Sequence, residues 1–301
     1  MKLLLQTQRK LRDIHLHEDL FRKLSPPSLF TQKPHLLQAM KNARGLCVVP
    51  KTAETLAMAA EVLKQLPRLE KLTVNFRNFS LGDDDLDSDV TRVWNTIRET
   101  LLQSFVPIGA PYMPIALTLL ELSDVSLSLC GSTWCQFLDL GALDHLIITY
   151  CPRADLFLDV LCDKSAPQLR TLLLVHELDD GAAGKCMIPS LEQFLKETAG
   201  RLWDLRVHLR NVQNTYTIPS PDCITPHGDT LDRLVIDAFC TAEEVCTVYR
   251  NEDLEMLLNA CPSITQLGIA MPDPYNDYGN RKRFRDFIVS NSPCHWLCWN
   301  R

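Results

Sequence analysis

The sequence predicts an α/β fold in which short parallel strands lie side by side in one layer and helices cover them on one side. Three observations predict it. A six-residue pattern of aliphatic positions recurs along the chain at near-regular spacing. Amphipathic stretches of helical period lie between several of its copies. Leucine makes up about one residue in six, well above ordinary usage. Small units repeated along the chain would explain all three.

The recurring pattern is an aliphatic residue, two others, an aliphatic residue, one other and an aliphatic residue. Its nine copies start at Leu11, Ala43, Leu69, Leu117, Leu143, Leu169, Leu202, Leu231 and Ile264. Successive starts lie 26 to 33 residues apart, except for one interval of 48 residues, in which we expect an inserted segment. The second and third aliphatic positions are two residues apart, so on a strand their side chains point the same way. Each copy is therefore predicted to be a short strand with one buried face.

Helices are predicted before several strands because apolar residues recur there at intervals of three and four. The clearest stretches are 36–40, 56–66, 191–195 and 254–258. Proline or glycine before a strand is predicted to end a helix at Pro67, Pro167, Gly200 and Pro262. The proline-rich segment from Ile218 to Gly228 is predicted as a loop. One unit cannot bury both a strand face and a helix stripe, whereas stacked units can. The alternatives are a non-repeat α/β domain with similar strands and an α-solenoid of helix pairs.

Composition narrows the class of protein. A net charge of −6 and a pI near 5.8 disfavour general nucleic-acid binding, which needs a cationic surplus. The most apolar window, Val106 to Leu120, contains three prolines, so we expect neither a membrane span nor a membrane partner. The start of the chain lacks the apolar core of a signal peptide. The 12 scattered cysteines are too few for a disulfide scaffold, and we expect reduced thiols in a cytoplasmic or nuclear protein.

The unit from Leu143 to Cys151 carries a family resemblance. Its sequence, Leu-Asp-His-Leu-Ile-Ile-Thr-Tyr-Cys, resembles a leucine-rich repeat with cysteine at the family's Asn/Cys position. The irregular unit lengths, and phrases such as Cys261-Pro262-Ser263-Ile264, resemble the repeat regions of fungal F-box proteins, which are substrate receptors of Skp1–cullin ubiquitin ligases. The resemblance implies a leucine-rich-repeat solenoid, with parallel strands on the concave side and helices on the convex side. Leu24 to Phe30 has a faint Leu-Pro-Pro character but follows the first strand, so we do not identify it as an F-box. Skp1 and cullin are implied as partners only if an F-box lies upstream.

Candidate binding residues lie on the strand face opposite the leucines, which would form the concave surface. The most polar group falls on the seventh and eighth strands and mixes both charge signs. The protein-binding candidates are Asp204, Arg206, His208, Arg233, Asp237, His145, Lys71 and Asn75. A solvated sheet face whose ion pairs serve no partner is the competing interpretation.

Other conspicuous motifs are given structural interpretations. The acidic run from Gly82 to Asp89 lacks the glycine and bidentate glutamate of a calcium loop and is predicted as an exposed loop before a helix over 90–102. The basic run from Arg281 to Arg285 is predicted as a solvated helix face. The close cysteine groups at 130–135 and 294–298 lack zinc-ligand spacing and are predicted to be buried thiols. In the segment from Gly181 to Cys186, the two glycines are too close together for a phosphate-binding loop.

We therefore expect one leucine-rich-repeat-like domain over residues 1–301, with an inserted acidic loop and helix near 80–105 and a C-terminal cap over 272–301. The expected function is a non-enzymatic protein–protein interaction scaffold, and more specifically the substrate-receptor part of a ubiquitin ligase. No catalytic residue, cofactor or metal is expected, because the common catalytic motifs do not occur. The alternative is an enzyme of unrecognised class on a non-repeat α/β domain, in which scattered His, Cys and Asp residues converge.

Overall fold

The computed structural model describes the strands and helices that carry the repeated pattern. The described residues are 12–17, 42–50, 59, 62–63, 66–77, 115–125, 127, 138–164, 168–177, 187–198, 200–210, 218–240, 245–247 and 249–269. The chain divides into two compact units, residues 1–143 and 144–301, and each is described by itself. The expectation of a single domain over 1–301 therefore stays a prediction. The inserted segment near 80–105, the cap over 272–301 and the motifs at 82–89, 130–135, 181–186, 281–285 and 294–298 lie outside the described residues.

In the first unit, four strands pair in parallel and in chain order. They are β1 (Asp13–His17), β2 (Gly45–Val49), β3 (Lys71–Asn75) and β5 (Leu119–Ser123). Two short strands, β4 (Ile115–Ala116) and β6 (Leu138–Asp139), pair separately and in parallel, and the 3-10 helix η1 (Leu140–Ala142) follows them. The predicted helix before β3 is described only at Ala59, Val62 and Leu63, which are helical and buried.

The second unit alternates strands and helices. Its elements in chain order are β7 (His145–Thr149), α8 (Ala154–Lys164), β8 (Thr171–Glu177), α9 (Met187–Glu197), β9 (Asp204–Arg210), α10 (Pro221–Ile224), η2 (Thr225–His227), β10 (Arg233–Cys240), β11 (Val245–Thr247), α11 (Asn251–Ala260) and β12 (Gln266–Ile269). The strands β7, β8, β9, β10 and β12 pair in parallel in that order. The short β11 pairs antiparallel with the end of β10, beyond the part that pairs with β12.

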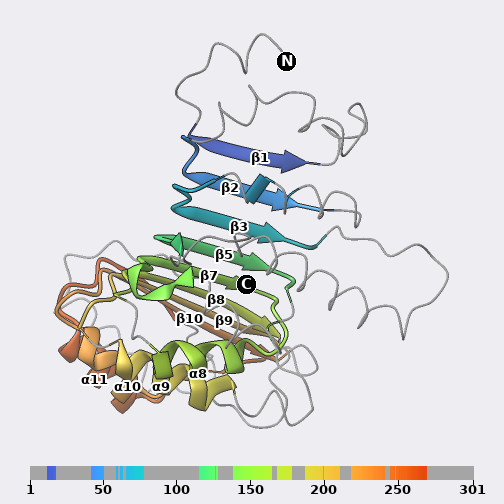
Figure 1. The fold of residues 1–301 in the computed structure, drawn as a ribbon. Coiled ribbons are helices and arrows are strands. Elements are labelled where there is room, and N and C mark those ends of the chain that lie inside the picture. Colours follow the sequence, from blue (N-terminus) through green and yellow to red (C-terminus); the bar gives the residue numbers. More distant parts are fainter. Residues whose placement is uncertain are drawn as a thin grey trace, which may run out of the picture. The chain divides into compact units, whose positions relative to one another are not determined.

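The helices of the second unit form one layer beside its sheet (Figure 1). α8 packs on α9, α9 on α10, and α10 on α11. The apolar stripe predicted for 191–195 is buried in α9, where Leu191, Phe194 and Leu195 are each 0% exposed. The parallel sheet with helices confirms the α/β prediction.

The aliphatic positions of neighbouring repeats stand opposite one another. The second aliphatic residues form a continuous ladder across the second unit, through Leu146, Leu172, Leu205, Leu234 and Leu267. In the first unit the corresponding ladder is Ile14, Leu46, Leu72 and Leu120. All of these side chains are buried except Leu267, which lies on β12. Burying one such side chain contributes about 1.5–3 kcal/mol, so this register is strongly favoured over its alternatives.

Seven of the described strands, β2, β3, β5, β8, β9, β10 and β12, also start with the same backbone hydrogen bonds. The carbonyl of Asp144 accepts from the N–H groups of Arg170 (2.8 Å) and Thr171 (3.0 Å), two consecutive residues at the start of the next strand. Six other carbonyls accept from two consecutive N–H groups at the start of the next strand in the same way. They belong to Arg12, Arg44, Glu70, Arg170, Trp203 and Asp232. These repeated hydrogen bonds show that successive repeats enter the sheet in the same way.

The segment from Ile218 to Gly228 was expected to be a loop, and this prediction is wrong. It folds into α10 and η2. The hydroxyl of Ser220 accepts from the N–H of Asp222 at 3.3 Å and caps α10, and Pro221 follows it. Both Pro221 and Pro226 stand in the first turn of a helix, where a missing N–H removes no hydrogen bond. Proline therefore begins helices in this segment instead of breaking them.

Candidate interaction surface

The sheet of the second unit has one face toward the helices and an opposite face that carries the candidate residues. Strand residues alternate between the two faces. The opposite face consists of His145, Ile147 and Thr149 of β7; Thr171, Leu173, Val175 and Glu177 of β8; Asp204, Arg206, His208 and Arg210 of β9; Arg233, Val235 and Asp237 of β10; and Gln266 and Gly268 of β12. Most of these side chains are half-buried, whereas the leucines between them are buried.

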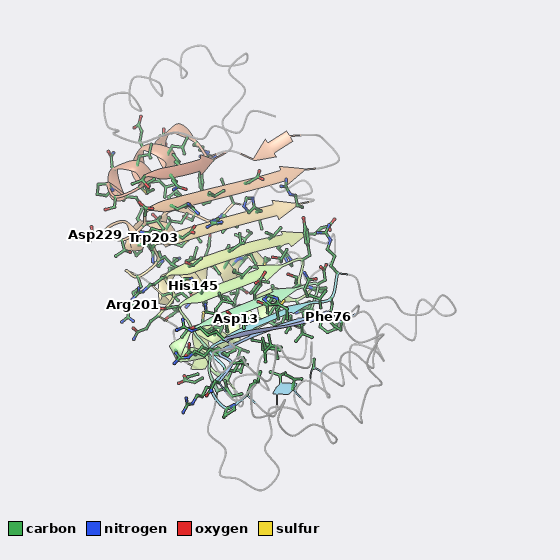
Figure 2. All side chains as sticks on the ribbon, turned by 90° about the horizontal axis from the view of Figure 1, so that it is seen from above. Asp13, Phe76, His145, Arg201, Trp203 and Asp229 are labelled. Carbon is green, nitrogen blue, oxygen red and sulfur yellow. The ribbon has the colours of Figure 1, made fainter. Side chains whose placement is uncertain are left out.

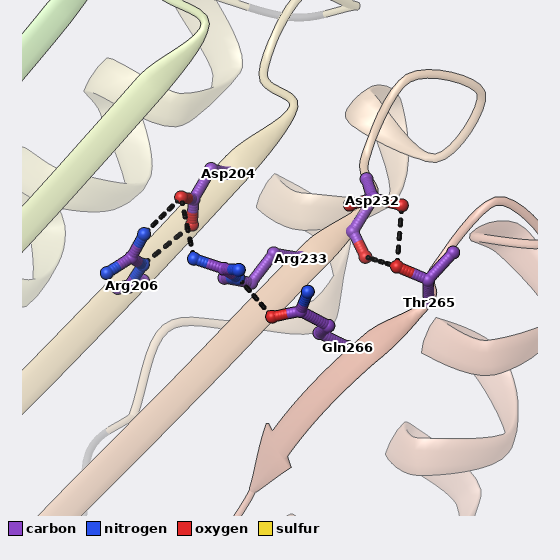
Figure 3. A network of polar contacts seen from close by, with 6 residues as sticks. All are labelled: Asp204, Arg206, Asp232, Arg233, Thr265 and Gln266. Atoms are coloured by element: carbon purple, nitrogen blue, oxygen red, sulfur yellow. Dashed lines mark hydrogen bonds and ion pairs between the residues drawn. The ribbon is translucent and has the colours of Figure 1, made fainter. Parts of the chain in front are cut away.

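A buried carboxylate lies at the centre of the polar part of this face (Figure 3). The guanidinium of Arg206 donates to Asp204 from both Nε (2.8 Å) and Nη2 (2.5 Å). Nη1 of Arg233 reaches the same carboxylate at 3.4 Å, and its Nε donates to Oε1 of Gln266 at 2.5 Å. The Asp204 side chain is 4% exposed, whereas those of Arg206 and Arg233 are 33% and 28% exposed. We call these four residues the Asp204 cluster.

The Asp204 carboxylate favours the charged form of Arg206. The hydrogen bond to Asp204, helped by the attraction between the two charges, raises the pKa of Arg206 despite partial burial. The guanidinium therefore stays charged at every physiological pH. A buried carboxylate needs charged partners, and Asp204 has two guanidiniums within reach. Removing both arginines would leave a desolvated carboxylate without a partner.

A second group of charges lies farther along the same strands. Asp237 of β10 is 3.2 Å from Nη2 of Arg210 and 3.5 Å from Nδ1 of His208. His208 and Asp237 are Cα partners across β9 and β10, which explains how residues 29 positions apart meet. The structure thus brings together the predicted residues Asp204, Arg206 and Arg233 in one cluster, and His208 and Asp237 in another.

The opposite face also has an apolar part. Ile147 on β7 and Leu173 on β8 are Cα partners, and Leu173 is in turn the partner of Arg206. Val175 stands beside His208 in the same way. Ile147, Leu173 and Val175, which we call the apolar patch, therefore adjoin the Asp204 cluster directly. His145 lies at the start of β7, two strands away from Asp204.

Residues just before each strand form a row at the strand starts of the second unit. Trp203, the residue before β9, is 52% exposed (Figure 2). Arg170, before β8, is 3.6 Å from Asp144. The hydroxyl of Thr265 donates to Oδ1 of Asp232 at 2.7 Å (Figure 3). Side chains of very different chemistry thus occupy equivalent positions.

Two of the candidate residues lie in the first unit, on β3. Lys71 is exposed, and Oδ1 of Asn75 accepts from the N–H of Arg77 at 2.9 Å, which turns the chain at the end of β3. The Thr73 hydroxyl donates to Glu121 at 3.0 Å. Burial, and secondarily the charge of Glu121, raise the pKa of the nearby Cys47 thiol. A nucleophilic cysteine needs the opposite shift, so this row offers no activated thiol.

Sequence reasoning missed Gln266 and Arg210. Gln266 occupies the same repeat position as Asp204 and Arg233, so the pattern contained the signal. Arg210 is the last residue of β9 and lies three positions beyond the end of the six-residue pattern at Val207. The burial of Asp204 was also not anticipated, since it depends on a guanidinium from the next strand.

The rest of the described chain adds few constraints on function. Among the described residues, no group of three or more His, Cys, Asp or Glu side chains is arranged to hold a metal ion. Within the same residues, no helix combines the length and the hydropathy needed to cross a membrane. Comparison of the chain with models of protein families, with curated proteins and with solved structures finds no match.

Proposed function

We propose that this chain is a non-enzymatic scaffold of the leucine-rich-repeat type, which binds a protein partner on the opposite face of the second unit. The observation that carries the proposal is the pair of aliphatic ladders in chain order, with the same backbone hydrogen bonds at the starts of seven strands. Stacked repeats of this kind leave one sheet face available for recognition. The resemblance to the repeat regions of fungal F-box proteins extends the proposal to a substrate receptor of a ubiquitin ligase.

The surface chemistry supports a protein partner. Protein interfaces combine an apolar centre with arginine and a polar rim. The apolar patch and the Asp204 cluster stand side by side on adjacent strands. Fixed guanidiniums next to aliphatic side chains provide both kinds of contact within a small area.

Affinity capture with matched variants tests the proposal. Leu173→Gln removes an apolar side chain from the apolar patch without adding charge, whereas Met256→Gln places the same residue on α11, at a side chain that is 43% exposed. We expect partners captured by the natural protein to be lost with Leu173→Gln and retained with Met256→Gln. Equal capture by both variants, or loss with Met256→Gln alone, would contradict the proposed face. Skp1 among the captured proteins, detected by immunoblot, tests the ubiquitin-ligase extension.

A further inference from the structure

We propose that the partner presents an extended acidic segment to this face, with carboxylates on Arg206 and Arg233 and apolar side chains on the apolar patch. This inference rests on the proposed function and specifies the chemistry of the partner. It follows from the charge, the hydrogen-bonding capacity and the spacing of the two neighbouring areas.

The solvent-facing charge of the Asp204 cluster is positive. Two guanidiniums share one carboxylate, and the carboxylate is the buried member of the group. About a third of the Arg206 and Arg233 side chains remains exposed, against 4% of Asp204. A group that approaches from solvent therefore meets the guanidiniums first, because the carboxylate of Asp204 is buried. Carboxylates are the side chains that complement guanidiniums.

The guanidiniums are also held in position before any partner arrives. Arg206 binds Asp204 through two nitrogens, and Arg233 is fixed between Asp204 and Gln266. A guanidinium has more N–H donors than these contacts use. Because the rotamer freedom of both side chains is already restricted, less entropy is lost when they bind a carboxylate.

The spacing suits an extended segment that crosses the strands. Neighbouring strands lie about 4.8 Å apart, so the midpoint of Ile147 and Leu173 lies about 10 Å from that of Arg206 and Arg233. About three residues of extended chain cover this distance at about 3.3 Å each. Apolar residues followed closely by acidic residues would therefore contact both areas.

Fluorescence anisotropy with a labelled peptide tests the inference. The probe carries three leucines, one serine and three glutamates; one control replaces the glutamates by lysine and another replaces the leucines by serine. We expect only the leucine–glutamate peptide to bind, and added salt to weaken it. Arg206→Gln and Arg233→Gln should each raise its Kd at least tenfold. Arg170→Gln, at an exposed arginine outside the Asp204 cluster, should leave the Kd unchanged.

A second kind of variant keeps the test valid if the arginine variants unfold. Val235 is the Cα partner of Arg206 and lies outside the apolar patch, so Val235→Glu adds a carboxylate beside the Asp204 cluster without removing a residue of the patch. It should also weaken the acidic peptide and should favour the lysine control. Equal binding of both peptides, no binding of the acidic peptide, or no response to folded Arg206→Gln and Val235→Glu would overturn the inference. Partner capture that still depends on Leu173 would then leave the proposed function standing without the acidic partner.

Discussion

Replacing Gly228 by alanine brings two effects of opposite sign into competition. The residue follows η2 with φ −54°, which any amino acid adopts, so backbone entropy alone would favour alanine by about 0.4–1 kcal/mol. However, a Cβ at this position would lie 1.8 Å from the carbonyl oxygen of Ala260 at the end of α11. Real Cβ atoms almost never come within 3.0 Å of another heavy atom, so the end of α11 would have to withdraw by about 1.2 Å. Overpacking of this kind costs about 1–3 kcal/mol, so after the entropy gain is subtracted we expect a net loss of about 1.3 kcal/mol.

Urea unfolding followed by circular dichroism measures this loss as a lower midpoint. Gly200 provides the control, because its φ of +81° is strained for other residues while the nearest atom to an added Cβ is 3.9 Å away. Gly200→Asn should recover part of the stability lost in Gly200→Ala, since asparagine tolerates the left-handed region. Gly228→Asn should be no better than Gly228→Ala. An unchanged or higher midpoint for Gly228→Ala would refute the steric argument.

Three further predictions concern stability and thiol reactivity. Burial lowers the pKa of His227, so the unfolded chain takes up a proton at this residue first as pH falls below about 6.5. The contribution of His227 to stability, which is constant above that pH, should then decrease by up to about 1.4 kcal/mol per pH unit. Urea unfolding at several pH values should show this slope reduced in His227→Phe. Leu205→Ala should cost about 2–5 kcal/mol and Trp203→Ala less than about 1 kcal/mol in the same assay, because Leu205 is fully buried and Trp203 half exposed. Burial raises the pKa of Cys223 to about 12, so iodoacetamide at neutral pH should label it in urea and not in the folded protein, as mass spectrometry would show.

His227 illustrates why the pH effect has this sign. The ring is 0% exposed and bridges two elements: Nδ1 accepts from the N–H of Leu202 at 3.4 Å, and Nε2 lies 2.9 Å from the carbonyl of Leu195. Nε2 therefore carries the proton of the neutral ring. A second proton, on Nδ1, would face the Leu202 N–H and remove this bond. A pH-independent difference between the natural protein and His227→Phe would contradict this assignment.

The part of the fold that depends on side-chain periodicity could be predicted from the sequence. Leu172, Leu205 and Leu234 occupy the same place in the six-residue pattern, and they meet in one ladder because apolar burial favours this register. The antiparallel β11 could not be predicted, since it follows no repeat position. Proline in α10 and η2 was misinterpreted because its effect depends on whether it stands in the first turn or the interior of a helix.

The sequence predicted which side chains share a face of the sheet. It did not predict which of them contact one another. Alternation along β9 predicted that Asp204, Arg206 and His208 share one face of the sheet, and the structure confirms this. The contacts of Asp204 with Arg233, and of Arg233 with Gln266, join three strands whose register had to be known first. Burial of the carboxylate is a consequence of those contacts, so single-strand reasoning could not reveal it.

The hydrogen bonds at the strand starts have a consequence for how this protein can change. They join backbone atoms alone, so the ladder does not dictate which side chain stands there, and Asp144, Arg170 and Trp203 occupy equivalent places. Substitutions in this row alter charge and shape at the rim of the second unit while the backbone connections persist. Such a rim can diversify over generations, acquiring new specificities at little cost to folding.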